Sequence, residues 1–331
     1  MALPSPQRVW QESRTRRASS RGPERLPAPF VVGVNRSGTT LLRMMLDAHP
    51  ELTIPPETHF LPELIEAAES TAPKPTPEAL LATITSQREW GDFGLSEDQL
   101  LERFRAIQPL NAGDALRAFY ESYAERVGKP RWGEKTPIYV KSMRKIERAL
   151  PEARFVHVIR DGRDVALSIR DRADKEHPID RIAERWVRRI TRAREQAKQL
   201  SHYTEIRYEN LILDTRPTLE TVCEFFELPW DDALLSYHER SGDRLEEMKR
   251  ELPDDGKRTT LSVERRMATH ARTTEKPDPR RVSRWREAMD RSDREEFEAI
   301  AGPLLVELGY RTGDGPGTEP RADANAAGGA Q

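Results

Sequence analysis

A loop rich in hydrogen-bond donors separates an apolar run from a helical pattern near the N-terminus. The apolar run, residues 30–34, predicts a short buried strand, and residues 41–46 have the apolar spacing of a helix. A helix N-terminus directs backbone N–H groups and the positive end of its dipole toward one point. The stretch therefore predicts an oxyanion site for phosphate or sulfate. The loop residues that would serve it are Arg36, Ser37, Gly38, Thr39 and Thr40.

This loop departs from the nucleotide-binding pattern Gly-x4-Gly-Lys-[Ser/Thr]. Gly33 and Gly38 have the required spacing, but Thr39 stands where that pattern has its lysine, and Arg36 lies inside the loop. The missing lysine disfavours ATP or GTP hydrolysis, and we predict no metal, because the sequence offers no dedicated Mg²⁺ ligand set. A guanidinium flanked by hydroxyls is suited to bidentate binding of a tetrahedral anion. A plain strand-to-helix turn is the alternative interpretation.

A second strand, turn and helix pattern occurs later in the chain. Residues 154–159 form a β-rich apolar run, residues 160–164 form a charged turn, and residues 165–168 open a helix. Two such units predict an α/β fold, with a central parallel sheet covered by helices and the ligand beyond the carboxyl ends of the strands. Arg160 and Arg163 can bind a second anion there or form surface salt bridges with neighbouring aspartates, and the sequence leaves both interpretations open.

Two ionisable residues lie close in sequence to the first loop, after a pair of prolines that stops regular structure. They are Glu57 and His59, and Thr58 between them is predicted to cap a helix that begins near Phe60. Residues 60–130 carry mostly helical spacing of apolar side chains and predict a helical insertion over the site.

The length and charge of the chain limit its possible domain organisation and partners. The 331 residues contain no fixed-period repeat, and they predict a disordered Arg-rich arm over 1–26, one catalytic domain over 27–311 and a disordered tail over 312–331. The formal net charge is −2 with 33% charged residues. Because this balance gives no overall basic field, nucleic acid is not expected as a partner.

Cysteine usage and hydropathy bear on location. The single Cys223 lies in a helical pattern, is predicted to be a small core residue and excludes an intrachain disulfide framework. No apolar run approaches the ~20 residues that span a bilayer, and the N-terminal arginines precede no apolar core, so neither an anchor nor a signal peptide is expected. These features predict a cytoplasmic protein. The oligomeric state stays open, with a homodimer as one alternative.

Several motifs together resemble the sulfotransferases that use 3′-phosphoadenosine 5′-phosphosulfate (PAPS), and among them the tyrosylprotein sulfotransferase branch and its bacterial relatives. The first and fourth motifs are specific, and all appear in family order across roughly residues 28–310. They occupy residues 35–50, 56–59, 134–137, 158–168, 208–211 and 228–230.

The resemblance implies sulfuryl transfer from PAPS to an acceptor hydroxyl, with 3′-phosphoadenosine 5′-phosphate (PAP) as product and no metal. It assigns the 5′-phosphosulfate to the first loop and the 3′-phosphate to the second junction, so that the two predicted anion sites serve one nucleotide. The implied cofactor-binding residues are Arg36, Ser37, Gly38, Thr39, Thr40, Arg160, Ser168, Arg172, Tyr208 and Lys276.

The resemblance also implies catalytic roles. Glu57 occupies the position of the family's general base, and Lys135 that of the lysine that stabilises the leaving group, with help from Arg36. His59 is the competing base, because cytosolic members of the superfamily use histidine. The family's catalytic serine has no secure match here; the alternatives are Thr273, Thr274 and Ser283.

The acceptor is not defined by these motifs. Expected partners are hydroxyl-bearing acceptors of the small-molecule, carbohydrate, lipid or phenol classes. Two other functions remain as alternatives: a P-loop-type nucleotide kinase, which Mg²⁺-dependent ATP turnover would reveal, and a noncatalytic nucleotide-binding protein.

Overall fold

Parallel strands form the centre of the fold. The computed structural model describes residues 25–72, 74–171, 177–256 and 258–313, so most of the predicted arm and tail lies outside the described residues. Within this part, one sheet has the order β4-β1-β5-β6 with every pair parallel, and a small sheet pairs β2 with β3. The strands are β1 (Ala28–Gly33), β2 (Leu52–Thr53), β3 (Arg131–Trp132), β4 (Glu134–Lys135), β5 (Ala153–Ile159) and β6 (Tyr203–Arg207).

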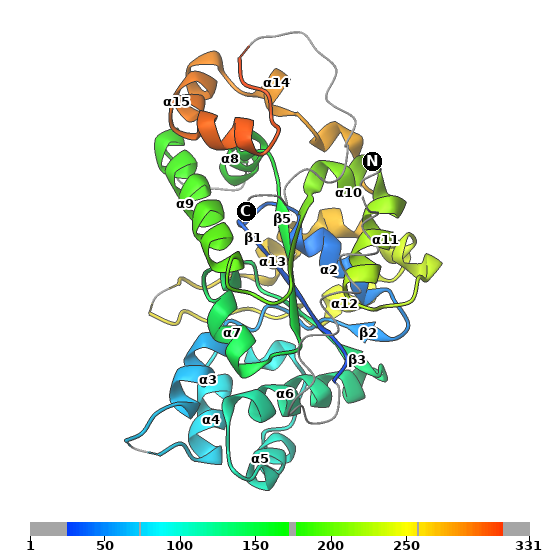
Figure 1. The fold of residues 1–331 in the computed structure, drawn as a ribbon. Helices are drawn as coiled ribbons and strands as arrows, with labels where there is room; N and C mark the ends of the chain where they lie inside the picture. Colours follow the sequence, from blue (N-terminus) through cyan, green and yellow to red (C-terminus); the bar gives the residue numbers. More distant parts are fainter. Residues whose placement is uncertain (1–24, 73, 172–176, 257, 314–331) are drawn as a thin grey trace, which may run out of the picture.

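Helices cover both faces of the main sheet, as Figure 1 shows. They are α2 (Thr39–Asp47), α3 (Leu61–Ala68), α4 (Pro77–Thr85), α5 (Glu97–Ala106), α6 (Ala112–Val127), α7 (Met143–Ala149), α8 (Gly162–Arg170), α9 (Ile179–Ala197), α10 (Tyr208–Leu213), α11 (Thr215–Phe225), α12 (Ser241–Glu246), α13 (Val263–His270), α14 (Trp285–Ala288) and α15 (Arg291–Glu307). The predicted α/β fold, a parallel sheet between two layers of helices, is confirmed.

The alternation of side chains along β1 explains the two layers. Phe30 and Val32 pack into the core that contains the helical insertion, whereas Val31 packs into the core beneath α2, α10 and α11. β5 runs beside β1, in register from Ala28 opposite Ala153 to Gly33 opposite Val158. Because the two strands end at the same edge, the loops that follow them lie side by side.

The helical insertion α3–α6 forms a lobe at the lower end of the view in Figure 1. Aromatic rings fill its centre, with the ring of Phe119 4.9 Å from that of Phe60 and 5.1 Å from that of Phe93, both edge to face. The predicted helix cap at Thr58 is wrong. Phe60 precedes α3 without a side-chain cap, and Thr58 Oγ1 instead donates to Glu134 Oε2 at 3.1 Å.

Ion pairs hold residues 241–278 on this lobe. The carboxylate of Asp92, which is buried, accepts hydrogen bonds from Arg250 at 2.7 Å and from Arg266 at 2.5 Å, and Glu89 pairs with Arg258 at 2.9 Å. From its sequence, the charged stretch beyond Trp230 is compatible with either a lid or a flexible connection. Its charged residues are in fact used to fix it over the insertion.

Arg163 is buried, not in a surface salt bridge. Its guanidinium binds both oxygens of Asp161, contacts Glu298 at 2.5 Å and lies 3.5 Å from the ring centroid of Trp285. Burial disfavours the guanidinium, yet the hydrogen bonds and charge of Asp161 outweigh it and raise the pKa of Arg163. Through its contact with Glu298, Arg163 anchors the start of α8 to α15.

We expect Arg163→Met to lower the free energy of unfolding by about 3–5 kcal/mol, because it leaves a buried carboxylate without its cation. Urea denaturation followed by circular dichroism measures the change. Arg105→Met is the matched control, since the pair of Arg105 with Glu78 lies on the surface and should contribute little. Equal losses in the two variants would contradict the prediction.

Candidate active site

The first predicted loop is a tight turn between β1 and α2. Arg36 has φ 75° and Gly38 has φ 98°, and the N–H of Ser37 donates to the carbonyl of Val34 at 3.1 Å. The hydroxyl of Ser37 is buried and makes no hydrogen bond within the described part of the chain. Helix α2 begins at Thr39, so the free N–H groups of its first turn face the loop. An unsatisfied buried hydroxyl beside these donors is the arrangement that an anion would complete.

The second junction is bonded directly to the first. Arg160 leaves the end of β5, lies 4.3 Å from the ring centroid of Tyr208, and donates to the carbonyls of Arg36 at 3.2 Å and Arg281 at 2.9 Å. Arg36 Nε in turn donates to Ser168 Oγ of α8 at 3.2 Å. Arg160 Nε is buried and has no partner among the described residues. The two loops thus form one cationic surface.

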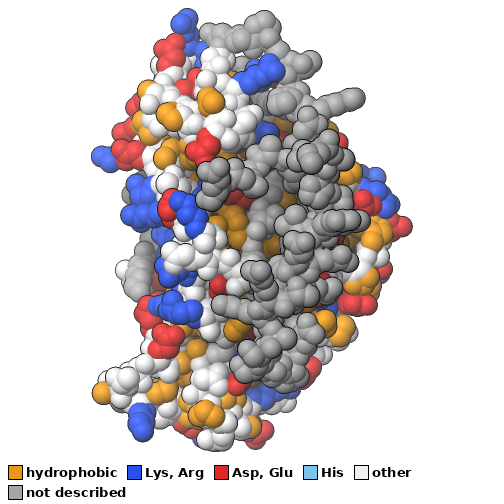
Figure 2. Space-filling model, in the orientation of Figure 1, with side chains coloured by type: hydrophobic (Ala, Val, Ile, Leu, Met, Phe, Trp, Pro, Cys, Tyr) orange, Lys and Arg blue, Asp and Glu red, His pale blue; other side chains and the backbone are white. Residues whose placement is uncertain are grey.

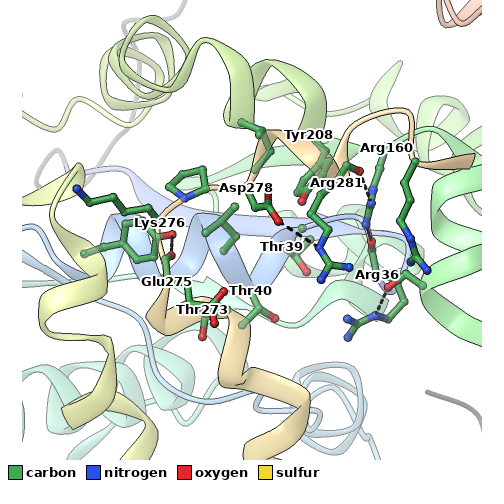
Figure 3. Close-up of a pocket in the computed structure, with 17 residues that line it drawn as sticks. Arg36, Thr39, Thr40, Arg160, Tyr208, Thr273, Glu275, Lys276, Asp278 and Arg281 are labelled. Atoms are coloured by element: carbon green, nitrogen blue, oxygen red, sulfur yellow. Dashed lines mark hydrogen bonds and ion pairs between the residues drawn. The ribbon is translucent and has the colours of Figure 1, made fainter. Parts of the chain in front are cut away.

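A pocket opens where these loops meet. Arg36, Arg160 and Arg281 gather at one end of it and Lys276 lies at the other, with Tyr208 among the residues that line it (Figure 3). Arg36 from the first junction and Arg160 from the second are neighbouring cations, which suit a ligand with two anionic groups. The same pocket includes Thr39 and Thr40 from the start of α2.

Glu57, Lys135 and His59 form a polar cluster beside this pocket. Lys135 Nζ lies 2.6 Å from Glu57 Oε1 and 3.3 Å from Thr40 Oγ1. His59 Nε2 lies 3.3 Å from Glu57 Oε2. The Lys135 side chain is 1% exposed and that of Glu57 is 32% exposed. Lys135 therefore links the candidate base to the anion loop, while Glu57 keeps access to solvent.

The backbone at His59 is strained. Its φ is 58°, an uncommon value for a residue with a side chain, and the N–H of Phe60 donates across it to the carbonyl of Thr58 at 2.7 Å. Such strain persists only where surrounding structure holds it in place. Here it turns the imidazole back toward Glu57.

The charges of the cluster act on one another. Burial opposes ionisation of Glu57, but the ammonium of Lys135 and the hydrogen bond with His59 outweigh it and hold the pKa of Glu57 well below its usual range. Burial also disfavours the imidazolium of His59, yet Glu57 raises its pKa above the usual value. Glu57 is therefore an anion throughout the neutral range, and His59 is its hydrogen-bonded partner.

Comparison with known proteins identifies the family. A family model described as the sulfotransferase family matches residues 27–232, which is more than half of the chain. The chain belongs to the sulfotransferase family. Over 225 residues it is 28% identical to protein-tyrosine sulfotransferase 1 of Danio rerio, covering 66% of this chain and 58% of that relative. Over 229 residues it is 28% identical to protein-tyrosine sulfotransferase A of Caenorhabditis elegans, covering 65% and 54%.

This sulfotransferase-family chain thus spans a little over half the length of those curated relatives. Its fold is similar to a sulfotransferase domain of the Synechococcus PCC 7002 olefin synthase, with a TM-score of 0.52 and 22% identity over 86% of this chain and 98% of that one. A sulfotransferase domain from the curacin biosynthetic pathway gives a TM-score of 0.57 and 21% identity over 88% and 100%. These two likenesses show the fold.

The sulfotransferase fold brings the predicted residues into two adjoining groups. Those that line the pocket are Arg36, Gly38, Thr39, Thr40, Arg160, Ser168, Tyr208 and Lys276. Ser37 is buried in the same loop, and Glu57, His59 and Lys135 form the cluster beside it. Arg172 lies outside the described residues. The roles assigned to these residues stay predictions.

Sequence reasoning missed several pocket residues. Arg281 and Arg284 both line the pocket, but they follow no anion-binding pattern that the sequence could reveal. Among the alternatives for the missing serine, Thr273 lines the pocket, whereas Thr274 and Ser283 are not among its lining residues. The hydroxyl of Thr274 donates to the carbonyl of Ala271. Thr273 is therefore the alternative that the geometry favours.

Gly38→Ala is expected to weaken at least tenfold the binding of PAP, the nucleotide product that the motif resemblance implies. A Cβ at this position would lie 2.3 Å from Tyr208 Cδ2, and φ 98° disfavours any side chain. The start of α2 must then shift, which costs on the order of 1–2 kcal/mol. Isothermal titration calorimetry measures the affinity. Gly128→Ala is the control, because Gly128 has φ 79° with nothing near its Cβ; it should lose stability but bind PAP normally.

Proposed function

We propose that this sulfotransferase-family chain transfers the sulfuryl group of PAPS to a hydroxyl of an acceptor. The observation that carries this proposal is the contact of Lys135 with both Glu57 and Thr40. It joins a candidate base to an anion loop at a single cation. A nucleotide that bears phosphates on both its 3′ and 5′ sides requires two anion sites, and the two loop junctions that meet at the pocket each supply one cation, Arg36 from the first and Arg160 from the second.

The residues present fit such a donor. The buried Ser37 hydroxyl and Arg160 Nε have no partner among the described residues, so a bound anion would satisfy both. We assign the 5′-phosphosulfate to Arg36, Ser37 and the N–H groups at the start of α2. We assign the 3′-phosphate to Arg160 and Ser168. No metal is required by this assignment, because arginine and lysine supply the positive charge.

The chain's residues have distinct tasks in the transfer. When bound, PAPS supplies a sulfuryl group whose bond to the 5′-phosphate oxygen breaks as the acceptor oxygen takes it. Lys135 and Arg36 provide positive charge where negative charge develops. Glu57 accepts the proton of the acceptor hydroxyl, and His59 orients the Glu57 carboxylate through its hydrogen bond. Placing acceptor and donor together supplies much of the remaining rate enhancement.

The lowered pKa of Glu57 bears on the acceptor class. A carboxylate held in its anionic form is a weak base, so it assists most effectively when the hydroxyl is itself acidic. A phenol, with a pKa near 10, meets this requirement far better than an aliphatic alcohol. The relatives that this chain matches are named protein-tyrosine sulfotransferases, and the side chain of tyrosine carries a phenol. On both grounds we propose a phenolic hydroxyl as the acceptor, in preference to carbohydrate or lipid hydroxyls.

Cytoplasmic location stays a prediction. Among the described residues, no helix combines the length and the apolar character needed to cross a bilayer.

Calorimetric titration with PAP, without metal, beside ATP with Mg²⁺ tests the donor assignment. Micromolar PAP binding with little ATP binding is the expected result, and it justifies an acceptor screen with PAPS. A preference for ATP, or no nucleotide binding at all, would overturn the proposal in favour of a kinase or a noncatalytic protein.

A further inference from the structure

A buried carboxylate lies directly behind the loop that carries Glu57. Glu134 in β4 has no exposed surface, and three hydroxyls donate to it. Thr136 Oγ1 binds Glu134 Oε1 at 2.6 Å, while Thr58 Oγ1 at 3.1 Å and Tyr120 Oη both bind Oε2. Thr58 is the residue between Glu57 and His59, so this network reaches the backbone on which both candidate bases stand.

The directions of these hydrogen bonds are consistent with an ionised Glu134. Tyr139 Oη accepts the N–H of Leu61 at 3.1 Å, and it lies 2.8 Å from Thr58 Oγ1, to which its own proton can be donated. Thr136 Oγ1 accepts the N–H of Thr58 at 3.0 Å while donating to Glu134. Each hydroxyl has a single proton, and in this arrangement three of them donate to the carboxylate oxygens.

Glu134 is separated from the reacting atoms by its own strand. Successive residues of a strand point to opposite faces, so Lys135 faces Glu57 while Glu134 faces the helical insertion. A buried carboxylate costs several kcal/mol relative to an apolar side chain. Burial does raise the pKa of Glu134 to about 7, although the three hydroxyls favour the anion. An apolar side chain could fill this position, but it could not hold Thr58.

We propose that Glu134 is a positioning residue that acts through Thr58 to fix Glu57 and His59 against Lys135. The proposal rests on the proposed function for its catalytic consequence, because it concerns the geometry of the same cluster. Without the network, the strained turn at His59 loses the hydrogen bonds that hold it, and the contact between His59 and Glu57 loosens. Glu134 itself touches neither donor nor acceptor.

Nuclear magnetic resonance titration of His59 tests the proposal without any donor or acceptor. The variants are Glu134→Gln, Thr58→Val, which removes the hydroxyl at nearly constant volume, and Thr58→Ser, which keeps it. Loss of the network should move the pKa of His59 from its raised value toward the ordinary 6.5 in the first two variants, and Thr58→Ser should retain the raised value. Glu89 and Arg258 also act on His59, and no variant changes them. His59→Asn identifies the resonance.

Single-turnover rates with PAPS and p-cresol, the side-chain analogue of tyrosine, test the catalytic consequence. We expect Glu134→Gln and Thr58→Val to slow the reaction about 10–100-fold with unchanged PAP affinity, and Glu134→Gln to add nothing in a Glu57→Gln background. An unchanged His59 pKa in Thr58→Val overturns the positioning role, even if Glu134→Gln fails to fold. Loss of PAP binding by the parent chain instead overturns the proposed function.

A separate observation concerns the outer side of α9. Four cations here form no ion pair with a carboxylate among the described residues. They are Lys141, at the end of the 3₁₀-helix η2 (Pro137–Lys141), and Arg185, Arg188 and Arg192 of α9. Figure 2 shows Lys and Arg side chains gathered along the left edge of the molecule, over α9. Burial and the like charges of Arg185 and Arg188 lower the pKa of Arg189. We call these five residues the basic face.

The basic face adjoins the anion loop. Arg189 Nη1 lies 3.4 Å from the Asn35 side-chain oxygen, and Asn35 precedes Arg36 in the loop. A group of cations that repel one another beside an anion site raises the local positive potential. Such a field increases the association rate of a multiply charged anion, and it does so less at high salt.

We infer that the basic face steers the polyanionic nucleotide donor toward the pocket, an inference that rests on the proposed donor. Stopped-flow association of PAP is the test. Arg188→Glu/Arg192→Glu should lower the association rate constant about tenfold at low salt and leave the dissociation rate constant unchanged. Arg103→Glu/Arg105→Glu on the remote α5 changes the net charge equally and serves as control. Equal effects in both double variants, or none in either, would overturn the inference, while absence of PAP binding overturns the donor assignment.

Discussion

Replacing Glu57 by glutamine is expected to lower kcat by about 10²–10⁴-fold and to leave PAP affinity nearly unchanged. The amide cannot accept the acceptor proton, whereas the residues that line the pocket do not include Glu57. Single-turnover kinetics with p-cresol and calorimetry with PAP measure the two quantities. Because Glu57→Gln also leaves Lys135 without its carboxylate, urea denaturation must accompany both measurements. A loss of PAP affinity equal to the loss of rate would contradict the assignment.

The pH dependence of kcat separates Glu57 from His59 as the base. The pKa of Glu57 is lowered from its ordinary value of 4.5. Its carboxyl group therefore stays ionised at every pH above 4.5 and is protonated only in more acidic solution. With Glu57 as base, kcat should stay level as pH falls from about 8 to about 5.5. The pKa of His59 is raised above 6.5, so a His59 base would make kcat fall as pH drops through neutrality. An acidic limb there that disappears in His59→Asn would favour His59.

Local sequence patterns predicted the two strand–turn–helix junctions, because each junction is encoded in a short stretch of sequence. An apolar run, a turn of small and cationic residues, and helical spacing identify β1 with α2 and β5 with α8 from short windows. A parallel arrangement of such strands in one sheet then follows from the α/β pattern, whereas their register, with Ala28 opposite Ala153, comes from the structure alone. The sequence alone therefore places Arg36 and Arg160 just after the ends of these two strands.

Contacts between residues far apart in the sequence could not be predicted from such local patterns. Strand β4 has two residues, Glu134 and Lys135, too few to show a period, and it joins the sheet only by pairing with β1. Thr58 has the chemistry of a helix cap, but Glu134 lies 76 residues away and competes for its hydroxyl. No local signal announces such a partner. The same holds for Arg281, which binds the second junction through a backbone carbonyl.

Lys135→Met is expected to lower kcat by about 10²–10³-fold, because it removes a preorganised cation from the place where charge develops on the leaving group. PAP affinity should fall much less, since Arg36 and Arg160 remain. The same change removes the main electrostatic cause of the lowered pKa of Glu57, so the carboxylate becomes a stronger base without its neighbouring cation. The measured rate loss is therefore the loss of charge stabilisation by Lys135, partly offset by the greater basicity of Glu57.

Lys129→Met is the matched control for this variant. Lys129 is half-buried, whereas Lys135 is almost fully buried, and Lys129 donates to the carbonyls of Asp47 and Leu52, away from the pocket. It should reduce stability and leave kcat unchanged. If Lys135→Met slows transfer no more than Lys129→Met does, Lys135 only neutralises Glu57. If the loss is specific to Lys135 and persists in a Glu57→Gln background, the lysine acts on the leaving group itself.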